Sequence, residues 1–226
     1  MTVKIGLVGD SLTEGRPGVS FINFLRERYP KITFVNLGKP GETIKSLHTR
    51  LTKTVLETDY ELIFLWIGVN DVYSKMLKVQ AQPVTCDYNE FQSIFTEVME
   101  MITVSTKQVV TVSPAVVGEN VRNEANEGLR ELSAIIQSIS QKYSNATFLN
   151  MQSVFENYLV NVNSSDYLST SIFRVMKDVL FYKNPKRINR LSKSRGLYLT
   201  LDGIHLNSRG AEMVADEYSN MIEQLL

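Results

Sequence analysis

The chain has 226 residues, a length that fits one globular domain with a substantial core and is short for two enzyme domains. Lysine plus arginine and aspartate plus glutamate number 24 each, so the formal net charge is zero and no overall field favours nucleic acid or an anionic membrane. The single cysteine, Cys86, excludes an internal disulfide and a cysteine-rich metal site and is compatible with a reducing compartment.

The N-terminal segment is expected to be a strand, Val3–Val8. It lacks the charged region, long apolar stretch and small-residue cleavage site of a secretory signal, and no run of about 20 apolar residues follows that could cross a bilayer. We therefore expect a cytoplasmic protein without a transmembrane segment. Gly9-Asp10-Ser11-Leu12 follows the run directly, which predicts Ser11 at the carboxyl end of a strand, where loops of a parallel sheet converge on ligands.

Four further short, apolar runs are expected to be strands: Ile32–Leu37, Leu62–Ile67, Val109–Val112 and Thr147–Leu149. Their apolar residues are consecutive rather than alternating, as in parallel strands that are covered on both faces. Helical spacing predicts helices over Ser20–Arg28, Thr43–Leu56, Asp87–Met101, Asn120–Tyr143 and Asn207–Leu226. The fold class is thus α/β, a three-layer α/β/α sandwich around a five-stranded, doubly wound parallel sheet.

Two of these helices carry finer expectations. In Thr43–Leu56, the residues Ile44, Leu47, Leu51 and Val55 recur at steps of three and four and predict one buried face. In Asp87–Met101, Asp87 is a plausible N-cap, and Glu90 three residues later completes a capping-box pattern.

A long connection precedes the last helix. We expect a single domain over residues 1–226 with a helical and basic insertion at about 157–200. Apolar residues in roughly helical register favour a helix over Tyr167–Tyr182, and the basic stretch from Lys183 to Arg195 is interpreted as a solvated face.

A serine hydroxyl becomes a good nucleophile only when a base takes its proton, and histidine is the usual base near neutral pH. His48 lies inside a predicted helix among polar residues and is interpreted as structural. His205 lies in a turn before the last helix, three residues after Asp202, whose carboxylate could orient the imidazole. The alternative is that Asp202 and Asn207 only cap a helix.

Acyl transfer also needs donors for the oxyanion of the tetrahedral intermediate. Gly41, after the second strand, could present its main-chain N–H without a side chain in the way, and Asn70, after the third, could present its amide. Each segment alone is also ordinary turn chemistry, as is Gly-Asp-Ser around Ser11.

Together these segments resemble a known family. Gly9-Asp10-Ser11-Leu12, the block from Asn36 to Thr43, Gly68-x-Asn70-Asp71 and Asp202-x-x-His205 are similar, in order and spacing, to the four signature blocks of the SGNH, or GDSL-type, hydrolases. The resemblance spans almost the whole chain and implies a flavodoxin-like fold. It also implies Ser11 as nucleophile, His205 and Asp202 as base and orienting acid, and the Ser11 main-chain N–H, Gly41 and Asn70 as the oxyanion hole.

The implied activity is hydrolysis of a small-molecule carboxylic ester, of the esterase or lipase-like acylhydrolase type, through an acyl-enzyme intermediate and without cofactor or metal. Two alternatives stay open: an O-acetyl esterase acting on a sugar or glycan, and a catalytically silent α/β binding module.

Other motifs are missing, namely Gly-x-Ser-x-Gly, a phosphate loop and a dinucleotide fingerprint, and no His/Cys/Asp cluster indicates a metal site. The family resemblance leaves the acyl and alcohol groups and the oligomeric state undefined.

Overall fold

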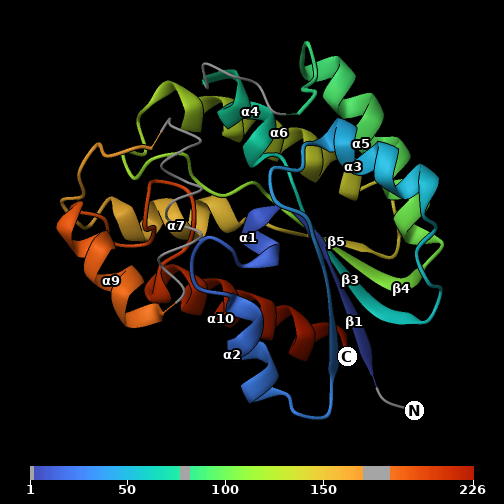
Figure 1. Ribbon diagram of the computed structural model, residues 1–226. Helices are drawn as coiled ribbons and strands as arrows, with labels where there is room; N and C mark the ends of the chain where they lie inside the picture. The colour runs from blue at the N-terminus through green and yellow to red at the C-terminus, as the bar shows by residue number, and fades with distance from the viewer. Residues whose placement is uncertain (1–2, 77–81, 170–183) are drawn as a thin grey trace.

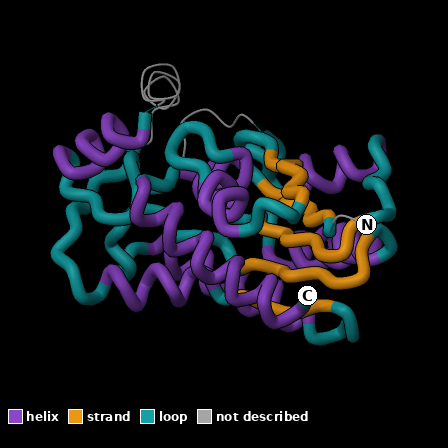
Figure 2. Tube along the Cα trace, turned by 90° about the horizontal axis from the view of Figure 1, so that it is seen from below, coloured by secondary structure: helices purple, strands orange, loops and turns teal. Residues whose placement is uncertain are grey.

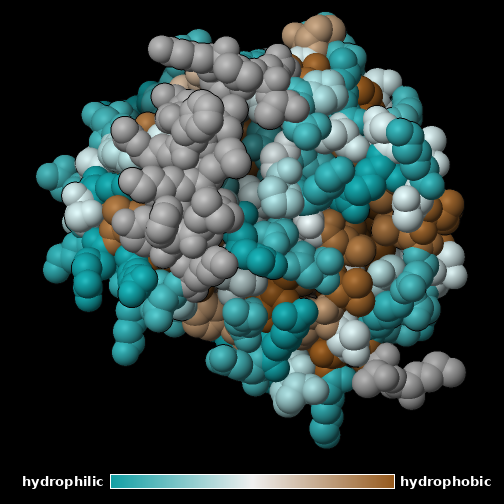
Figure 3. Space-filling model, viewed as in Figure 1, coloured by the Kyte–Doolittle hydropathy of each residue, from teal (hydrophilic) through white to brown (hydrophobic). Residues whose placement is uncertain are grey.

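The computed structural model of the chain describes residues 3–76, 82–169 and 184–226. Most of the helix expected over Tyr167–Tyr182, and Lys183 at the start of the basic stretch, lie outside these residues. None of the helices in the described ranges is both long and apolar enough to span a membrane. On the face shown in Figure 3, hydrophilic side chains predominate and hydrophobic ones gather in separate patches.

A single five-stranded sheet lies at the centre, and all of its neighbouring strands are parallel (Figure 1). The strand order is β2-β1-β3-β4-β5, as in flavodoxin-like doubly wound folds. The strands are β1 (Lys4–Gly9), β2 (Thr33–Gly38), β3 (Tyr60–Trp66), β4 (Thr106–Val112) and β5 (Ala146–Leu149). All five expected strands are confirmed, with bounds shifted by at most a few residues.

Helices cover both faces of the sheet, which confirms the three-layer α/β/α sandwich (Figure 1). The described helices are α1 (Ser11–Glu14), α2 (Phe21–Arg28), α3 (Ile44–Lys53), α4 (Val69–Met76), α5 (Tyr88–Thr103), α6 (Glu124–Ser140), α7 (Met151–Leu159), α9 (Pro185–Ser194) and α10 (Ser208–Leu225). Helices α3, α5 and α6 form one layer, and α2 and α10 pack together in the other.

The packing of helices against the sheet explains why the strands are continuous apolar runs in the sequence. Phe64 of β3 is buried and stacks on Tyr218 of α10, with ring centroids 4.0 Å apart, and Phe21 of α2 meets the same tyrosine edge-on at 5.0 Å. Helices cover both faces of the sheet, so consecutive residues of β3 are buried (Figure 1).

Two expected helices are shorter than predicted. Helix α3 ends at Lys53 rather than Leu56, and Val55, expected on its buried face, is 81% exposed. The β-branched residues Thr52, Thr54 and Val55 disfavour continuation of the helix. Helix α6 begins at Glu124 rather than Asn120, because the Asn123 side chain caps it and also donates to the carbonyl of Val117 at 2.7 Å.

The capping box expected at the start of α5 is only half present. The carboxylate of Asp87 accepts from the N–H of Glu90 at 2.8 Å, as predicted. The Glu90 carboxylate, however, accepts from the N–H of Cys86 at 2.6 Å and forms an ion pair with Lys45. The Glu90 carboxylate therefore bonds the N–H of Cys86, one residue before the expected partner Asp87, and also pairs with Lys45 of the neighbouring helix α3.

The strand register aligns the loops that carry the candidate site. Gly9 at the end of β1 lies opposite Gly38 at the end of β2 and Trp66 at the end of β3. The chain therefore leaves all three strands at the same edge of the sheet. Figure 2 shows the strands, in orange, running side by side among the helices that flank them.

Candidate active site

Ser11, His205 and Asp202 form one hydrogen-bonded chain. Ser11 Oγ lies 3.0 Å from His205 Nε2, and His205 Nδ1 lies 2.7 Å from Asp202 Oδ2. All three side chains are buried, with Ser11 5% exposed and His205 6%. The serine is the first residue of α1, just after β1, and the other two residues come from the turn before α10, so the fold brings together Ser11 and His205, which are 194 residues apart.

The turn from Asp202 to His205 is built around the aspartate. Its Oδ1 accepts hydrogen bonds from the main-chain N–H groups of Ile204 at 3.0 Å and His205 at 2.9 Å, which leaves Oδ2 for the imidazole. Burial opposes ionisation of Asp202, but the charge of His205 and these hydrogen bonds outweigh it, so the pKa of Asp202 lies below its ordinary value. Asp202 is therefore an imidazole partner and not a helix cap, whereas Asn207 does cap α10.

The structure also brings Gly41 and Asn70 to this edge of the sheet. Gly41 has a φ of +73°, a conformation that side chains disfavour, and its N–H meets no acceptor among the described residues. Asn70 is 8% exposed, and its Nδ2 donates to the carbonyl of Glu42 at 3.0 Å and to Asp10 Oδ2 at 3.2 Å. The Asn70 amide thus contacts both the Gly41 loop and the residue before Ser11.

Two further carboxyl groups are buried beside these loops. Burial raises the pKa of Asp10 to about 7, although the hydrogen bond from Leu12 and the charge of His205 act in the opposite direction. Burial likewise raises the pKa of Asp71 to about 7, with the neighbouring charge of Asp10 adding to the effect and the hydrogen bond from Ile44 opposing it. Both groups therefore change charge near neutral pH.

The loop between β2 and α3, which contains Gly41, is held by contacts with α3 and α4. The carboxylate of Glu42 is fully buried and pairs with the guanidinium of Arg50, which also donates to the carbonyl of Leu37 at 3.1 Å. Asp71 accepts from the N–H of Ile44 at 3.1 Å, and the Thr43 side chain caps α3 in a reciprocal capping box with Ser46. These contacts fix the loop against both α3 and α4.

Glu119, in the loop after β4, is a positioning residue that the sequence did not indicate. Its buried carboxylate accepts four hydrogen bonds, each 2.8 Å long: from the N–H groups of Tyr198, Leu199 and Thr200 and from the Thr200 hydroxyl. The N–H of the adjacent Gly118 donates to the carbonyl of Gly203 at 2.7 Å. Glu119 thus holds the segment that leads into the Asp202 turn, and no local motif marks a glutamate in that role.

His48 lies away from this constellation, as expected. It belongs to α3, and its Nε2 lies 2.8 Å from the Glu97 carboxylate of α5, with both side chains partly exposed. No group of three or more histidine, cysteine, aspartate or glutamate side chains that could hold a metal ion is found within the described ranges.

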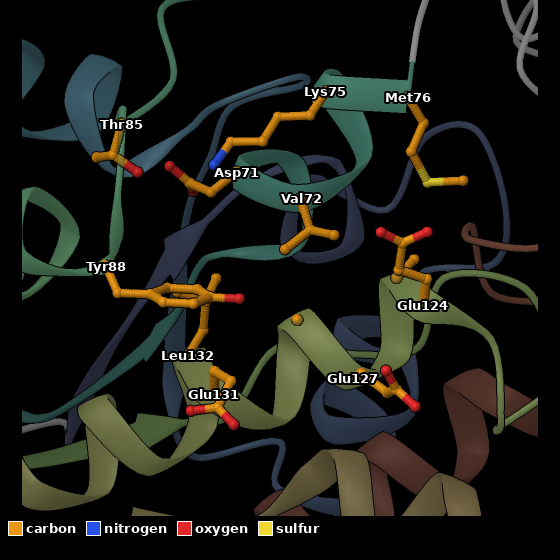
Figure 4. A pocket seen from close by; sticks show the side chains of 12 residues that line it. Asp71, Val72, Lys75, Met76, Thr85, Tyr88, Glu124, Glu127, Glu131 and Leu132 are labelled. Carbon is orange, nitrogen blue, oxygen red and sulfur yellow. The ribbon is translucent and has the colours of Figure 1, made fainter.

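A cavity of about 560 Å³ lies between α4, α5 and α6 (Figure 4). Asp71, Lys75, Tyr88 and three glutamates of α6 line it, and the Lys75 nitrogen points toward the Asp71 carboxylate. Neither Ser11 nor His205 is among its lining residues. The cavity therefore lies beside α4, which carries Asn70 and Asp71, and is not the place where the serine would meet its substrate.

A buried Ser-His-Asp chain at the carboxyl edge of a parallel α/β sheet is typical of serine hydrolases. The family model of the GDSL-like lipase/acylhydrolases matches residues 5–218, so the chain belongs to that family. No functionally curated protein matches the chain by sequence.

Solved structures share the fold over nearly the full length. An acetyl xylan esterase, AlAXEase, superposes with a TM-score of 0.72 at 22% identity and covers 97% of this chain and 100% of its own. An acetylxylan esterase from Geobacillus stearothermophilus gives 0.70 at 17% identity, covering 98% and 96%. An alpha/beta hydrolase from the metagenome of Lake Arreo, Spain, gives 0.70 at 17%, covering 99% and 96%. The Geobacillus enzyme has also been solved as catalytic mutants of a serine, an aspartate and a histidine.

Proposed function

We propose that Ser11 is the nucleophile of a carboxylic-ester hydrolase that works through an acyl-enzyme intermediate. His205 Nε2 takes the proton of the Ser11 hydroxyl as Oγ forms a bond to the ester carbonyl carbon, and Asp202 stabilises the resulting imidazolium. The imidazolium then protonates the leaving alcohol as the ester C–O bond breaks. Water repeats the sequence and releases the acid. The three catalytic mutants of the Geobacillus enzyme concern the same residue types.

The proposed oxyanion donors are the main-chain N–H groups of Ser11 and Gly41 and the side-chain amide of Asn70. The alignment of the ends of β1, β2 and β3 supports this assignment, because the three donors follow those ends directly. Loss of one oxyanion donor typically lowers kcat by roughly 10²–10³-fold, and we expect that loss for Asn70→Ala. An unchanged kcat would remove Asn70 from the proposal.

The continuous contact from Ser11 through His205 to Asp202 is the single observation that carries the proposal. A fluorophosphonate probe should label wild-type Ser11, as read by mass spectrometry, and Ser11→Ala should lose both the label and turnover of p-nitrophenyl acetate. Ser194→Ala, at an exposed serine of α9, is the control and should keep both. Turnover by folded Ser11→Ala contradicts the mechanism, and an unlabelled wild type favours a silent binding module.

A second candidate is an O-acetyl esterase acting on a carbohydrate. Its support is that structures described as acetylxylan esterases share this fold over at least 96% of both chains. Acetate release from acetylated xylo-oligosaccharides, compared with a p-nitrophenyl ester series from acetate to octanoate, separates it from a longer-chain acylhydrolase.

For the compartment we propose the cytoplasm, on the strength of the one exposed, free thiol of Cys86.

A further inference from the structure

The side-chain amide of Asn70 has no spare donor in this structure. An amide nitrogen carries two N–H groups, and here one faces the carbonyl of Glu42 at 3.0 Å while the other faces Asp10 Oδ2 at 3.2 Å. Both acceptors are oxygens that cannot donate when Asp10 is ionised. They therefore select which end of the amide is the nitrogen, and they turn that nitrogen toward the loops of Ser11 and Gly41.

Asp10 is fixed on both of its oxygens. It is 1% exposed, and its Oδ1 accepts from the N–H of Leu12 at 2.9 Å, which caps the short helix that begins with Ser11. Its Oδ2 is left for Asn70. A single carboxylate thus connects the turn of the proposed nucleophile to the proposed oxyanion donor at the start of α4.

We propose that Asp10 is a positioning residue for Asn70. Its Oδ2, on the residue adjacent to Ser11, holds one amide N–H of Asn70, and this N–H is donated to the oxyanion when it forms. The inference rests on the proposed function, because it requires Asn70 to be an oxyanion donor. The contact at 3.2 Å is at the long end of the N–H···O range and its acceptor is a side-chain oxygen, so it is the one of the two Asn70 bonds that can be exchanged for the oxyanion.

A cap on α1 is the competing explanation for Asp10, and one substitution separates the two roles. Serine is a good N-cap residue, so Asp10→Ser keeps an acceptor for the Leu12 N–H. Its side chain is too short to hold Asn70 as well. Asp10→Asn is the second variant, because its one amide oxygen can serve Leu12 or Asn70 but not both.

The test is a double-mutant cycle on kcat with p-nitrophenyl acetate at pH 8, where Asp10, with a pKa of about 7, is ionised. It uses wild type, Asp10→Ser, Asn70→Ala and the double variant. Loss of a hydrogen bond to a charged group corresponds to about a tenfold or larger fall in rate. We expect about a tenfold lower kcat for Asp10→Ser when Asn70 is present, and at most about a twofold change when it is absent. Any effect of the Asp10 charge on His205 occurs in both backgrounds and cancels.

Each outcome has a defined meaning. Equal falls in both backgrounds overturn the positioning role, and so does an unchanged kcat in Asp10→Ser. Retained kcat in Asn70→Ala overturns the oxyanion assignment itself, which is a failure of the proposed function. Urea unfolding shows that each variant is folded, and Asp10→Asn takes the place of Asp10→Ser in the cycle if the latter does not fold. The labelling rate of Ser11 by a fluorophosphonate is the second readout in the slow background.

Discussion

The buried carboxylate of Glu119 offers a sharp test of how the Asp202 turn is held. In Glu119→Gln, the amide oxygen can replace Oε1, which accepts from Leu199 and from both donors of Thr200. The amide nitrogen then faces the N–H of Tyr198, where two donors meet. In Glu119→Ala all four donors lose their acceptor.

The expected loss of stability follows from the number of hydrogen bonds that each variant loses. A hydrogen bond to a charged group contributes about 1.5–3 kcal/mol, so Glu119→Gln should lower the free energy of unfolding by about 2 kcal/mol. Four donors, three of them fully buried, are left without acceptors in Glu119→Ala, which should cost on the order of 5 kcal/mol since such losses are not additive. That cost is comparable with the whole stability of many domains. Because residues 198–200 lead directly into the Asp202 turn, kcat should fall as well.

Urea unfolding and kcat on p-nitrophenyl acetate measure the two effects. Glu131→Ala, at an exposed glutamate of α6, is the matched control and should change stability by less than about 0.5 kcal/mol. Wild-type stability and kcat in Glu119→Ala would refute the reasoning. A loss of stability equal to that of the control would do the same.

Three further predictions concern other parts of the site and its surroundings. A Cβ at Gly38 would lie 2.3 Å from the main-chain nitrogen of Glu14, so Gly38→Ala should destabilise the protein by about 1–3 kcal/mol and lower kcat by displacing α1; normal urea unfolding would contradict this. With a folded-state pKa of about 7, Asp71 is protonated at pH 5 and ionised at pH 8, so this group should lower wild-type stability by about 3 kcal/mol as pH rises. Asp71→Asn should lack that loss, and parallel pH curves of unfolding free energy would rule the prediction out. His48→Gln should keep kcat within about twofold, because its pairing with Glu97 is partly exposed and remote from Ser11; a large fall would reopen the choice of base.

The fold was largely predictable because its signals are local. Consecutive apolar runs gave all five strands, since strands covered on both faces leave no polar alternation. The ends of helices were less predictable. Val55 continues the apolar spacing of α3, yet it is exposed because β-branched neighbours end the helix at Lys53.

The candidate site was predictable to the extent that its residues lie in short motifs at strand ends. The spacing of Asp202 and His205 indicated a contact that the structure contains. Glu119 could not be found in this way, because its partners at 198–200 are distant in sequence and three of its four donors are main-chain N–H groups, which any residue type can supply. The contact between Asn70 and Asp10 could not be predicted for a related reason: the two residues are 60 positions apart, and neither motif indicates a partner in the other.

The occupied amide of Asn70 has a consequence for substrate affinity under the proposed mechanism. A neutral ester carbonyl is a poor competitor for an N–H that already faces a carboxylate, whereas an oxyanion is a strong one. The amide would then contribute little to the Michaelis complex and much to the tetrahedral intermediate. An interaction made only at that stage raises kcat without lowering KM. The Asn70–Asp10 hydrogen bond would therefore be exchanged only when the carbonyl oxygen becomes charged, and the amide would not strengthen binding of the uncharged ester.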